Sequence, residues 1–486
     1  MEAKGNFIDG AWKKVSAPTG RVVSKNPAKP SEILWQQDVS KAAVDDAVAA
    51  ARAAFPSWRK LSLDDRAALL TKLKDAIDRA SIMLAEAIAR EAGKALWEAK
   101  SEITALKGKI DITLADARKD IERTRVDASS MLTFHPHGVM AVLGPFNFPL
   151  SLSHGHIVPA LLAGNTVVLK PSELTPMVAQ LYTELFVAAG FPSGVFNLLH
   201  GGGDVGAALA THPDVRGVLF TGSYDVGRAI TLANIDQPQK ILALEMGGKN
   251  ASIVFGDAGF DAALYETVFS AFVTTGQRCT ATSRLIVLDG VFDRFVDRFI
   301  AAAKALVVGD PFGEKTFMGP LVAEKSLQKF MAATAALDRS SKTLVTTKRI
   351  GEGYLVTPHV VLVEDPAAPA LQEEIFGPSV AIYRARDEEH AMQLANDTPF
   401  GLALSVFTAD EARFERCLDA SRAGIVNWNK GTVGATGKLP FGGVGKSGNF
   451  RPAGNFSVRY CTYPVATVSA PATAAPPALP PGMTLP

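Results

Sequence analysis

The stretch GVMAVLGPFNFPLSLSHGHIVPALLAGNTVVLKPSE, residues 138–173, decides how the chain folds. Its apolar runs Val139–Leu143 and Thr166–Lys170 have the length and β-branched content of buried strands. Although the whole span is apolar, prolines, histidines and Asn147 interrupt it, so it is not expected to cross a membrane. The stretch predicts the first strands of a sheet that alternates with helices.

Strand-like and helix-like segments continue to alternate on its C-terminal side. In the first block, strands are expected at Val195–His200, Gly217–Phe220 and Ile241–Leu244, and helices at Thr175–Ala189, Val205–Thr211 and Val226–Asn234. In a second block, strands are expected at Ser252–Val254, Leu285–Leu288, Val360–Val363, Val380–Tyr383, Leu404–Phe407 and Gly424–Asn427, and helices at Val291–Leu306, Glu324–Ala336, Asp387–Asn396 and Asp410–Ala423. Such alternation favours parallel sheets covered by helices, so we predict an α/β fold with two domains in series.

The N-terminal part has a different pattern. Residues 5–40 are expected to form short extended pieces, and residues 41–117 contain Ala-rich amphipathic helices. A strand or hairpin is expected within residues 120–136. After Val465 the composition shifts to Ala and Pro, which cannot bury a core, so the end of the chain is predicted to be disordered.

Composition narrows the class of protein. The chain has 486 residues and a formal charge of +1, so neither a nucleic acid nor an anionic membrane is expected as a partner. Its three cysteines, Cys279, Cys417 and Cys461, lack the spacing of a disulfide framework or a zinc ribbon. Together with an N-terminus that does not resemble a signal peptide, this predicts a cytoplasmic protein.

A candidate nucleophile lies in Thr275-Gly276-Gln277-Arg278-Cys279-Thr280, which follows an apolar helical run. A thiol in such a turn is accessible, but at its ordinary pKa of about 8.5 only a few per cent is thiolate at neutral pH. Arg278 and nearby backbone N–H groups are expected to stabilise the thiolate and so lower the pKa of Cys279. Alternatively, Cys279 is a small buried residue, as most lone cysteines are.

Two Gly-rich loops could hold a phosphate. Residues 201–206 (GGGDVG) match the pattern G-x-G-x-x-G, and residues 220–227 (FTGSYDVG) also join a strand to a helix. In each, exposed N–H groups and the positive end of a helix dipole could bind a pyrophosphate. Spacing alone does not choose between them.

Polar residues follow several predicted strands. Lys170 and Glu173 could grip the hydroxyls of a ribose, or they could be a solvated strand end. Glu245 lies between apolar residues, where its pKa would rise toward that of a general base, unless it forms a structural ion pair. Asn147 could donate to an oxyanion or form a turn. A histidine as the base of Cys279 is not excluded, and no metal site is expected, because the closely spaced histidines lack a third ligand.

In chain order these motifs resemble the aldehyde dehydrogenase superfamily, from Phe7 to about Pro464. The motifs are GPFNFP (144–149), KPSE (170–173), FTGS (220–223), LEMGGK (244–249), GQRC (276–279), EIFGP (374–378) and PFGG (440–443). Each motif is weak, but their order is not expected by chance. The resemblance implies two Rossmann-type domains with parallel sheets and a small β element for oligomerisation.

The resemblance also implies roles for residues. Cys279 would attack an aldehyde, Asn147 and the Cys279 backbone N–H would hold the oxyanion, and Glu245 would activate the water that hydrolyses the thioester. Cofactor binding is implied for Phe146, Lys170, Ser172, Glu173, Gly222, Ser223, Tyr224, Asp225, Val226, Gly227, Glu374 and Phe376. Residues 222–227 would approach the pyrophosphate and residues 201–206 would support the adenine side. Glu173 should repel a 2′-phosphate, which favours NAD over NADP.

The chain further resembles a subgroup whose aldehyde substrate carries distant carboxylates, in the motifs GHIVPALLAGN (155–165), AFVT (271–274), VNWNK (426–430) and GNFRP (448–452) with Tyr460-Cys461. Candidate cations for such a substrate are Arg278, Lys430 and Arg451, which could instead be solvated or structural charges. The chain departs from the subgroup at Ser153-His154, at Ala453-Gly454-Asn455 and in its Pro/Ala-rich tail, and this leaves the substrate open. Two alternatives remain, an acylating dehydrogenase that passes the thioester to coenzyme A and a non-catalytic dinucleotide-binding relative.

The implied domains and assembly follow the family. A homodimer or homotetramer is expected, because extended arms with unpaired edges normally pair with another subunit. The predicted parts are an NAD-binding domain (1–118 and 137–247), a catalytic domain (248–446), an oligomerisation element (119–136 and 447–466) and a disordered tail (467–486).

Overall fold

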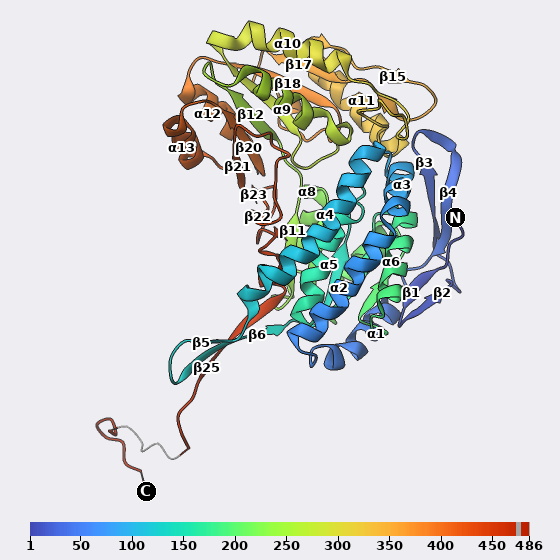
Figure 1. Ribbon diagram of the computed structural model, residues 1–486, viewed down its shortest axis with the longest axis vertical. Helices are drawn as coiled ribbons and strands as arrows, with labels where there is room; N and C mark the ends of the chain where they lie inside the picture. Colours follow the sequence, from blue (N-terminus) through green and yellow to red (C-terminus); the bar gives the residue numbers. More distant parts are fainter. Residues whose placement is uncertain (473–477, 486) are drawn as a thin grey trace.

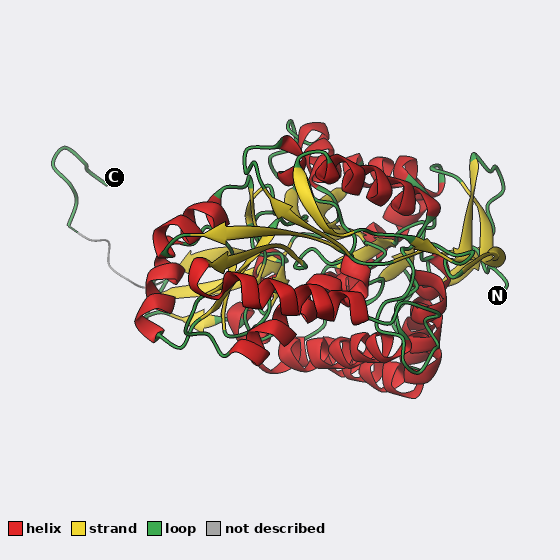
Figure 2. Cartoon of the chain, turned by 90° about the horizontal axis from the view of Figure 1, so that it is seen from above, coloured by secondary structure: helices red, strands yellow, loops and turns green. Residues whose placement is uncertain are grey.

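The computed structural model, which describes residues 1–472 and 478–485, contains two seven-stranded sheets covered by helices (Figures 1 and 2). The first sheet has the order β11 (Ile241–Glu245), β10 (Val215–Thr221), β7 (Val139–Leu143), β8 (Thr166–Lys170), β9 (Phe196–Leu198), β1 (Asn6–Ile8) and β2 (Ala11–Lys13). The second has the order β14 (Ser341–Val345), β17 (His359–Val363), β18 (Ser379–Ala385), β13 (Thr282–Leu288), β12 (Asn250–Val254), β20 (Ala403–Phe407) and β21 (Ile425–Trp428). Only β1, β2 and β14 pair antiparallel within these sheets, so the predicted α/β fold with mostly parallel sheets is confirmed.

Successive residues of the first sheet point to opposite cores. Met140 and Val142 of β7 join the core beneath the N-terminal helices, whereas Val139, Ala141 and Leu143 join the core on the other face. Because both faces are covered, the strand is apolar at every position rather than at alternate ones. This explains why the run at 139–143 can be recognised as a buried strand from its composition.

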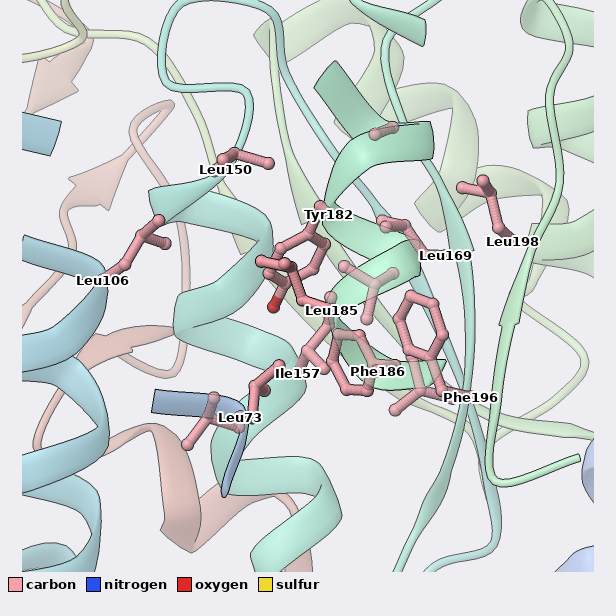
Figure 3. Packing of buried hydrophobic residues seen from close by; sticks show 14 of the residues in the cluster. Leu73, Leu106, Leu150, Ile157, Leu169, Tyr182, Leu185, Phe186, Phe196 and Leu198 are labelled. Carbon is pink, nitrogen blue, oxygen red and sulfur yellow. The ribbon is translucent and has the colours of Figure 1, made fainter. Parts of the chain in front are cut away.

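Helices cover the first sheet on both faces. On one face lie α2 (Leu63–Arg79), α3 (Ser81–Ala92), α4 (Leu96–Ala115), α5 (Ser151–Ala163) and α6 (Pro176–Ala189), and on the other lie α1 (Ala43–Trp58), α7 (Gly203–Thr211) and α8 (Tyr224–Ala233). Figure 3 shows how Ile157, Tyr182 and Phe186 fill the space between α5, α6 and the sheet. Phe186 stacks on Phe196 with ring centroids 3.9 Å apart.

Helix α5 was not predicted. It is buried along nearly its whole length and carries Pro159 in its interior, so the sequence shows neither an amphipathic period nor an uninterrupted helical run. Its two histidines are hydrogen-bonded: His154 Nδ1 lies 2.7 Å from the Tyr182 hydroxyl, and His156 Nδ1 lies 2.8 Å from the Tyr460 hydroxyl. These partners make a polar pair tolerable inside a core.

The second sheet has its own helices: α9 (Phe260–Phe272), α10 (Phe292–Ala305), α11 (Glu324–Asp338), α12 (Glu388–Asn396) and α13 (Glu411–Ala420). Strand β14, the antiparallel edge, was also not predicted. Short antiparallel pairs complete the two lobes: β3 (Gly20–Asn26) with β4 (Lys29–Val39), β15 (Arg349–Ile350) with β16 (Leu355–Val356), β19 (Phe400–Gly401) with β23 (Val444–Gly445), and β22 (Pro440–Phe441) with β24 (Ala453–Gly454).

A three-stranded arm projects from the body (Figure 1). It consists of β5 (Thr124–Arg125), β6 (Ser130–Pro136) and β25 (Thr462–Val468), which follows the short helix α14 (Ser457–Tyr460). The strand expected within residues 120–136 is therefore confirmed, and it pairs with the C-terminal strand. The role of the arm in oligomerisation and the domain limits remain predictions.

The start of the disordered tail, predicted at residue 467, is placed too early in the sequence. Strand β25 continues to Val468, which pairs with Ser130, so residues 467 and 468 belong to the arm. Residues 473–477 and 486 of the predicted tail lie outside the described residues. Among the residues that the structure describes, no helix is long and apolar enough to cross a membrane.

Candidate active site

The predicted nucleophile lies in a loop of unusual backbone conformation between α9 and β13. Thr274 and Thr275 have φ of 57° and 55°, and Gly276 follows with φ of 66°. For β-branched residues this left-handed region costs roughly 1–3 kcal/mol each, so the surrounding structure must hold it. A side chain at Gly276 would collide with the backbone of Gly377, so only glycine allows the two loops to touch. The reversal leaves Cys279 partly exposed, three residues before β13 begins.

The electrostatic environment of Cys279 differs from the expected one. Burial of its surroundings raises the pKa of the thiol, and the negative charges of Glu245 and Glu374 raise it further. Arg278 lowers it, as expected, but its effect is outweighed. These effects favour the protonated thiol, so its proton must pass to a base before the sulfur can attack.

Asn147 lies beside the nucleophile loop. Its Nδ2 donates to the backbone carbonyl of Gln277 at 2.8 Å, and the residue is 5% exposed. Because a carboxamide nitrogen carries two hydrogens, this bond orients the group and leaves the second hydrogen for an oxyanion. Asn147 and Cys279 are thus brought together from positions far apart in the sequence.

Glu245 ends the edge strand β11 and is only 1% exposed. Among the described residues, no group donates a hydrogen bond to either of its carboxyl oxygens. Burial raises its pKa well above the ordinary value, and only Arg451 acts in the opposite direction. A buried carboxyl without a partner is unusual in a folded protein and is typical of a group reserved for a reaction.

The segment after Ser447 fixes the backbone on which Glu245 lies. Gly448 forms a bridge with Glu245, and the Asn449 side chain accepts from the Leu244 N–H at 2.8 Å and donates to the Leu242 carbonyl at 2.9 Å. These bonds satisfy the free edge of β11 and hold the end of the strand.

Glu374 lies directly on the two glycines that follow Met246. Its Oε1 accepts from the Gly248 N–H at 2.9 Å, and a side chain at Gly247 would collide with its carboxylate. Burial raises the pKa of Glu374 to about 7, against the Gly248 hydrogen bond and the charge of Lys249. Phe376, at φ of 53°, has its ring 5.8 Å from that of Phe146. The loop that carries the residues predicted for the nicotinamide ribose, Glu374 and Phe376, therefore lies against the loop of Phe146.

The loop from β10 to α8 fits a pyrophosphate. Ser223 caps α8 by accepting from the Val226 N–H at 3.4 Å, and the first turn of α8 carries one acidic side chain, Asp225. A side chain at Gly222 would collide with Phe220, and one at Gly227 would collide with Met246. The glycines thus allow close packing of the helix end onto the sheet, which leaves N–H groups at the dipole's positive end for an anion.

The second half of a dinucleotide site lies at the end of β8. Lys170 Nζ is 3.3 Å from Glu173 Oε2; burial lowers the pKa of this lysine, and the charges of Glu173 and Asp204 oppose that effect. A side chain at Gly206 would lie 3.7 Å from Lys170 Cδ, so the loop 201–206 flanks this residue. The Ser172 hydroxyl accepts from the Leu174 N–H at 3.2 Å and is thereby engaged in a local turn. These positions fit the ribose end of a nicotinamide dinucleotide, and the individual roles remain predictions.

The three candidate cations differ in how far their charges are already paired. Arg278 donates from Nη2 to Glu98 at 3.0 Å, which favours the structural alternative, and Lys430 pairs with Glu266. Arg451, at φ of 50°, donates to the Gly443 carbonyl at 2.6 Å. Within residues 1–472 and 478–485 no carboxylate lies within ion-pair distance of Arg451, so it keeps an unpaired charge close to the site.

Sequence patterns did not indicate the charged residues behind the site. Lys94, Glu98 and Glu102 are each 2% exposed or less and contact the two loops that carry Asn147 and Cys279. A spacing of four residues between two glutamates on an Ala-rich helix is common on solvated faces, so it gave no signal.

Comparisons with known proteins agree with this geometry. A model of the aldehyde dehydrogenase family matches residues 12–466. The chain is 43% identical over 487 residues to an N-succinylglutamate 5-semialdehyde dehydrogenase of Chromobacterium violaceum, covering 99% of each chain. It is similar to the structure of an NAD-dependent aldehyde dehydrogenase of Sinorhizobium meliloti, with a TM-score of 0.93 and 30% identity over 98% of this chain and 96% of that one. It is also similar to a 1-pyrroline-5-carboxylate dehydrogenase from Thermus with bound NAD, with a TM-score of 0.90 and 32% identity over 96% and 92%. The chain therefore belongs to the aldehyde dehydrogenase family, whose members oxidise aldehydes with a nicotinamide dinucleotide.

Proposed function

We propose that the protein oxidises N-succinyl-L-glutamate 5-semialdehyde to N-succinyl-L-glutamate with NAD, as in the arginine succinyltransferase route of arginine catabolism. The substrate is supported by identity of 43% to a relative of that name over 99% of both chains. The reaction is supported by one observation above all: Glu245, buried and without a hydrogen-bond partner among the described residues, acts electrostatically on Cys279.

In the proposed reaction the Cys279 thiol gives its proton to Glu245, and the sulfur attacks the aldehyde carbon. The carbonyl π electrons move to oxygen, and the second Asn147 N–H and the Cys279 backbone N–H hold this oxyanion. A bound nicotinamide dinucleotide supplies the hydride acceptor. Loss of hydride leaves a thioester on Cys279. Glu245, having released its proton to solvent, then removes a proton from water, whose oxygen attacks the thioester carbon and expels the thiolate.

Hydrolysis rather than transfer to coenzyme A is supported by Glu245. An enzyme that passes its thioester to a thiol must avoid activating water at the same position. The combination of Cys279, Asn147 and Glu245 at one site also argues against a non-catalytic dinucleotide-binding protein. The product assay is direct: in the presence of coenzyme A, the acid and not the acyl-CoA should accumulate.

A panel of aldehydes tests the substrate. The succinylated semialdehyde should have a kcat/KM at least about tenfold above that of glutamate semialdehyde and of neutral aldehydes of similar length, because it carries the distant carboxylates. Equal kcat/KM values across the panel would contradict this substrate while leaving aldehyde oxidation intact.

Arg451→Met should raise the KM for the succinylated semialdehyde by about tenfold or more, since a charge-assisted hydrogen bond contributes about 1.5–3 kcal/mol. The KM for a neutral aldehyde should change less than twofold. Lys430→Met is the comparison, because its charge is already paired with Glu266 and its loss should change KM less. Equal effects of Arg451→Met on acidic and neutral aldehydes would remove Arg451 as a carboxylate-binding residue.

Glu173→Gln should shift cofactor preference toward NADP by about tenfold, because the carboxylate that repels a 2′-phosphate is removed. The measurement is the ratio of kcat/KM for NAD to that for NADP. Asp204→Asn is a matched control, since Asp204 also acts on Lys170 but lies in the neighbouring Gly-rich loop. If the ratio of kcat/KM for NAD to that for NADP changed in Asp204→Asn but not in Glu173→Gln, the loop 201–206 and not Glu173 would discriminate between the two cofactors.

A further inference from the structure

The start of α4 and Lys94, two residues before it, lie behind the candidate active site and contact both of its loops. Glu98 faces the nucleophile loop: its Oε2 accepts from the Thr274 N–H at 3.2 Å, and its Oε1 accepts from the Thr274 hydroxyl and from Arg278 Nη2 at 3.0 Å. One carboxylate thus binds three donors of a single loop. These donors include both polar groups of a threonine in the left-handed conformation.

Glu102, one turn further along the same helix, faces the other loop. Its Oε1 accepts from the N–H groups of Leu150 at 3.1 Å and Ser151 at 3.0 Å, which are the first unpaired donors of α5. The loop that carries Asn147 ends at these residues. Glu102 therefore fixes where that loop enters its helix.

Lys94 connects the two carboxylates, whereas Arg278 contacts only Glu98. Lys94 Nζ lies 2.8 Å from Glu102 and 3.8 Å from Glu98. Both cations also lie over the ring of Phe148, the residue after Asn147. Lys94 Nζ is 3.4 Å and Arg278 Cζ is 4.9 Å from the ring centroid. Burial opposes ionisation of Glu98, but Lys94, Arg278 and the Thr274 bond together hold its pKa below the ordinary value. The cluster is thus buried, and both loops share it.

We propose that Glu98 and Glu102, which we call the carboxylate clamp, are positioning residues that set the distance between the Asn147 amide and Cys279. Because Glu98 and Glu102 are each 1% exposed and bond to the two loops, the clamp acts through those loops. An oxyanion needs both donors within hydrogen-bond distance of one oxygen, and a displacement of about 1 Å can cost about a hundredfold in rate. This inference rests on the proposed roles of Asn147 and Cys279.

The clamp also accounts for the strained threonines. Thr274 and Thr275 are neighbours with nearly the same left-handed backbone, but only Thr274 bonds to the clamp, whereas the Thr275 hydroxyl donates to the Gly319 carbonyl at 2.9 Å. The strained reversal is therefore held on one side by α4 and on the other by the second lobe. This difference supplies a matched pair of variants.

The first test replaces each carboxylate by its isosteric amide in the full chain. First-turnover NADH formation is measured with NAD and whichever aldehyde the wild type oxidises fastest. Glu98→Gln and Glu102→Gln should each lower this rate at least about tenfold, while the Kd for NAD changes less than twofold. Glu91→Gln is the control, because Glu91 is also buried and also accepts two N–H groups at a helix start, those of Met177 and Val178 on α6. It should keep the wild-type rate within about twofold.

A second readout separates positioning from general loss of structure. Alkylation of Cys279 by iodoacetamide needs the sulfur but no oxyanion site. Glu102→Gln, which acts on the Asn147 loop, should leave the alkylation rate within about threefold of wild type, whereas Glu98→Gln should change it more than threefold. Thr274→Val should lower first-turnover NADH formation at least about fivefold, and Thr275→Val should stay within about threefold.

The outcomes distinguish this inference from the proposed function. First-turnover rates of Glu98→Gln and Glu102→Gln within twofold of wild type, or an equal loss in Glu91→Gln, would overturn the clamp while leaving the roles of Cys279 and Asn147 in place. An active Cys279→Ala variant would instead overturn those roles. If the charge changes prevent folding, Thr274→Val against Thr275→Val decides, since neither changes a charge.

Discussion

Cys279→Ala is expected to oxidise aldehydes at least about ten-thousandfold more slowly than the wild type, because no covalent adduct can form without the sulfur. NAD binding should be unchanged, since the dinucleotide is expected to contact other loops. The measurement is steady-state NADH formation with the best aldehyde of the panel, combined with mass spectrometry of the wild type stopped during turnover. An acylated peptide that contains residue 279 should appear in the wild type and be missing in the variant.

The other two cysteines, Cys417 and Cys461, provide control variants for this experiment. Cys417 and Cys461 are both buried, and burial raises the pKa of each thiol, that of Cys417 to about 11. Their replacement by alanine should leave aldehyde oxidation within about threefold of wild type, whereas stability should fall because a buried side chain is shortened. Turnover that survives in Cys279→Ala, or is lost equally in Cys461→Ala, would mean that the covalent mechanism is wrong.

The parts of the fold that were predicted are those where burial is uniform or strictly periodic. The strand at 139–143 is apolar at every position, and that at 166–170 at its three central positions, because helices cover both faces of their sheet; that composition is visible in the sequence. Helix α5 is equally buried, but a helix without a polar face has no period to detect, and Pro159 further obscured it. A strand that is buried on both faces can thus be predicted from its composition, whereas a helix that is buried on all sides cannot be predicted from its periodicity.

The candidate site was predictable only in its short-range parts. The motif around Cys279, the carboxylate at the end of β11 and the capped turn into α8 are local features with local signals. The contact from Arg278 to Glu98 spans 180 residues, and nothing near either residue indicates it. Arg278 was therefore expected to favour the thiolate of Cys279, whereas the fold engages it with Glu98 and surrounds the sulfur with two carboxylates. Such long-range pairing decides the electrostatics of the site.

Glu245→Gln is expected to lower steady-state turnover by about 10²–10⁴-fold, because general-base catalysis contributes about that factor. Because Cys279 is partly exposed, solvent can accept the thiol proton in this variant, so the first turnover still proceeds and NADH forms in a burst of about one per active site. The thioester accumulates because no base activates water. Rapid-mixing measurement of the burst and mass spectrometry of the thioester on Cys279 test this. Glu374→Gln is the matched control: its carboxylate also acts on Cys279, but its loss should raise the KM for NAD without producing a burst.

The pH dependence separates the two carboxylates further. Burial raises the pKa of Glu245 well above its ordinary value, so the fraction of ionised base should rise with pH through that raised pKa. The kcat of the wild type should rise with it, and the kcat of Glu245→Gln should not.

The stability of the fold should change with pH in the opposite direction. A carboxyl whose pKa is higher in the folded state than in the unfolded state stabilises the fold at low pH and loses that contribution as pH rises through the folded value. The Tm of the wild type should therefore fall relative to that of Glu245→Gln as pH rises, and parallel Tm curves together with an unchanged kcat profile would show that Glu245 is not the titrating base.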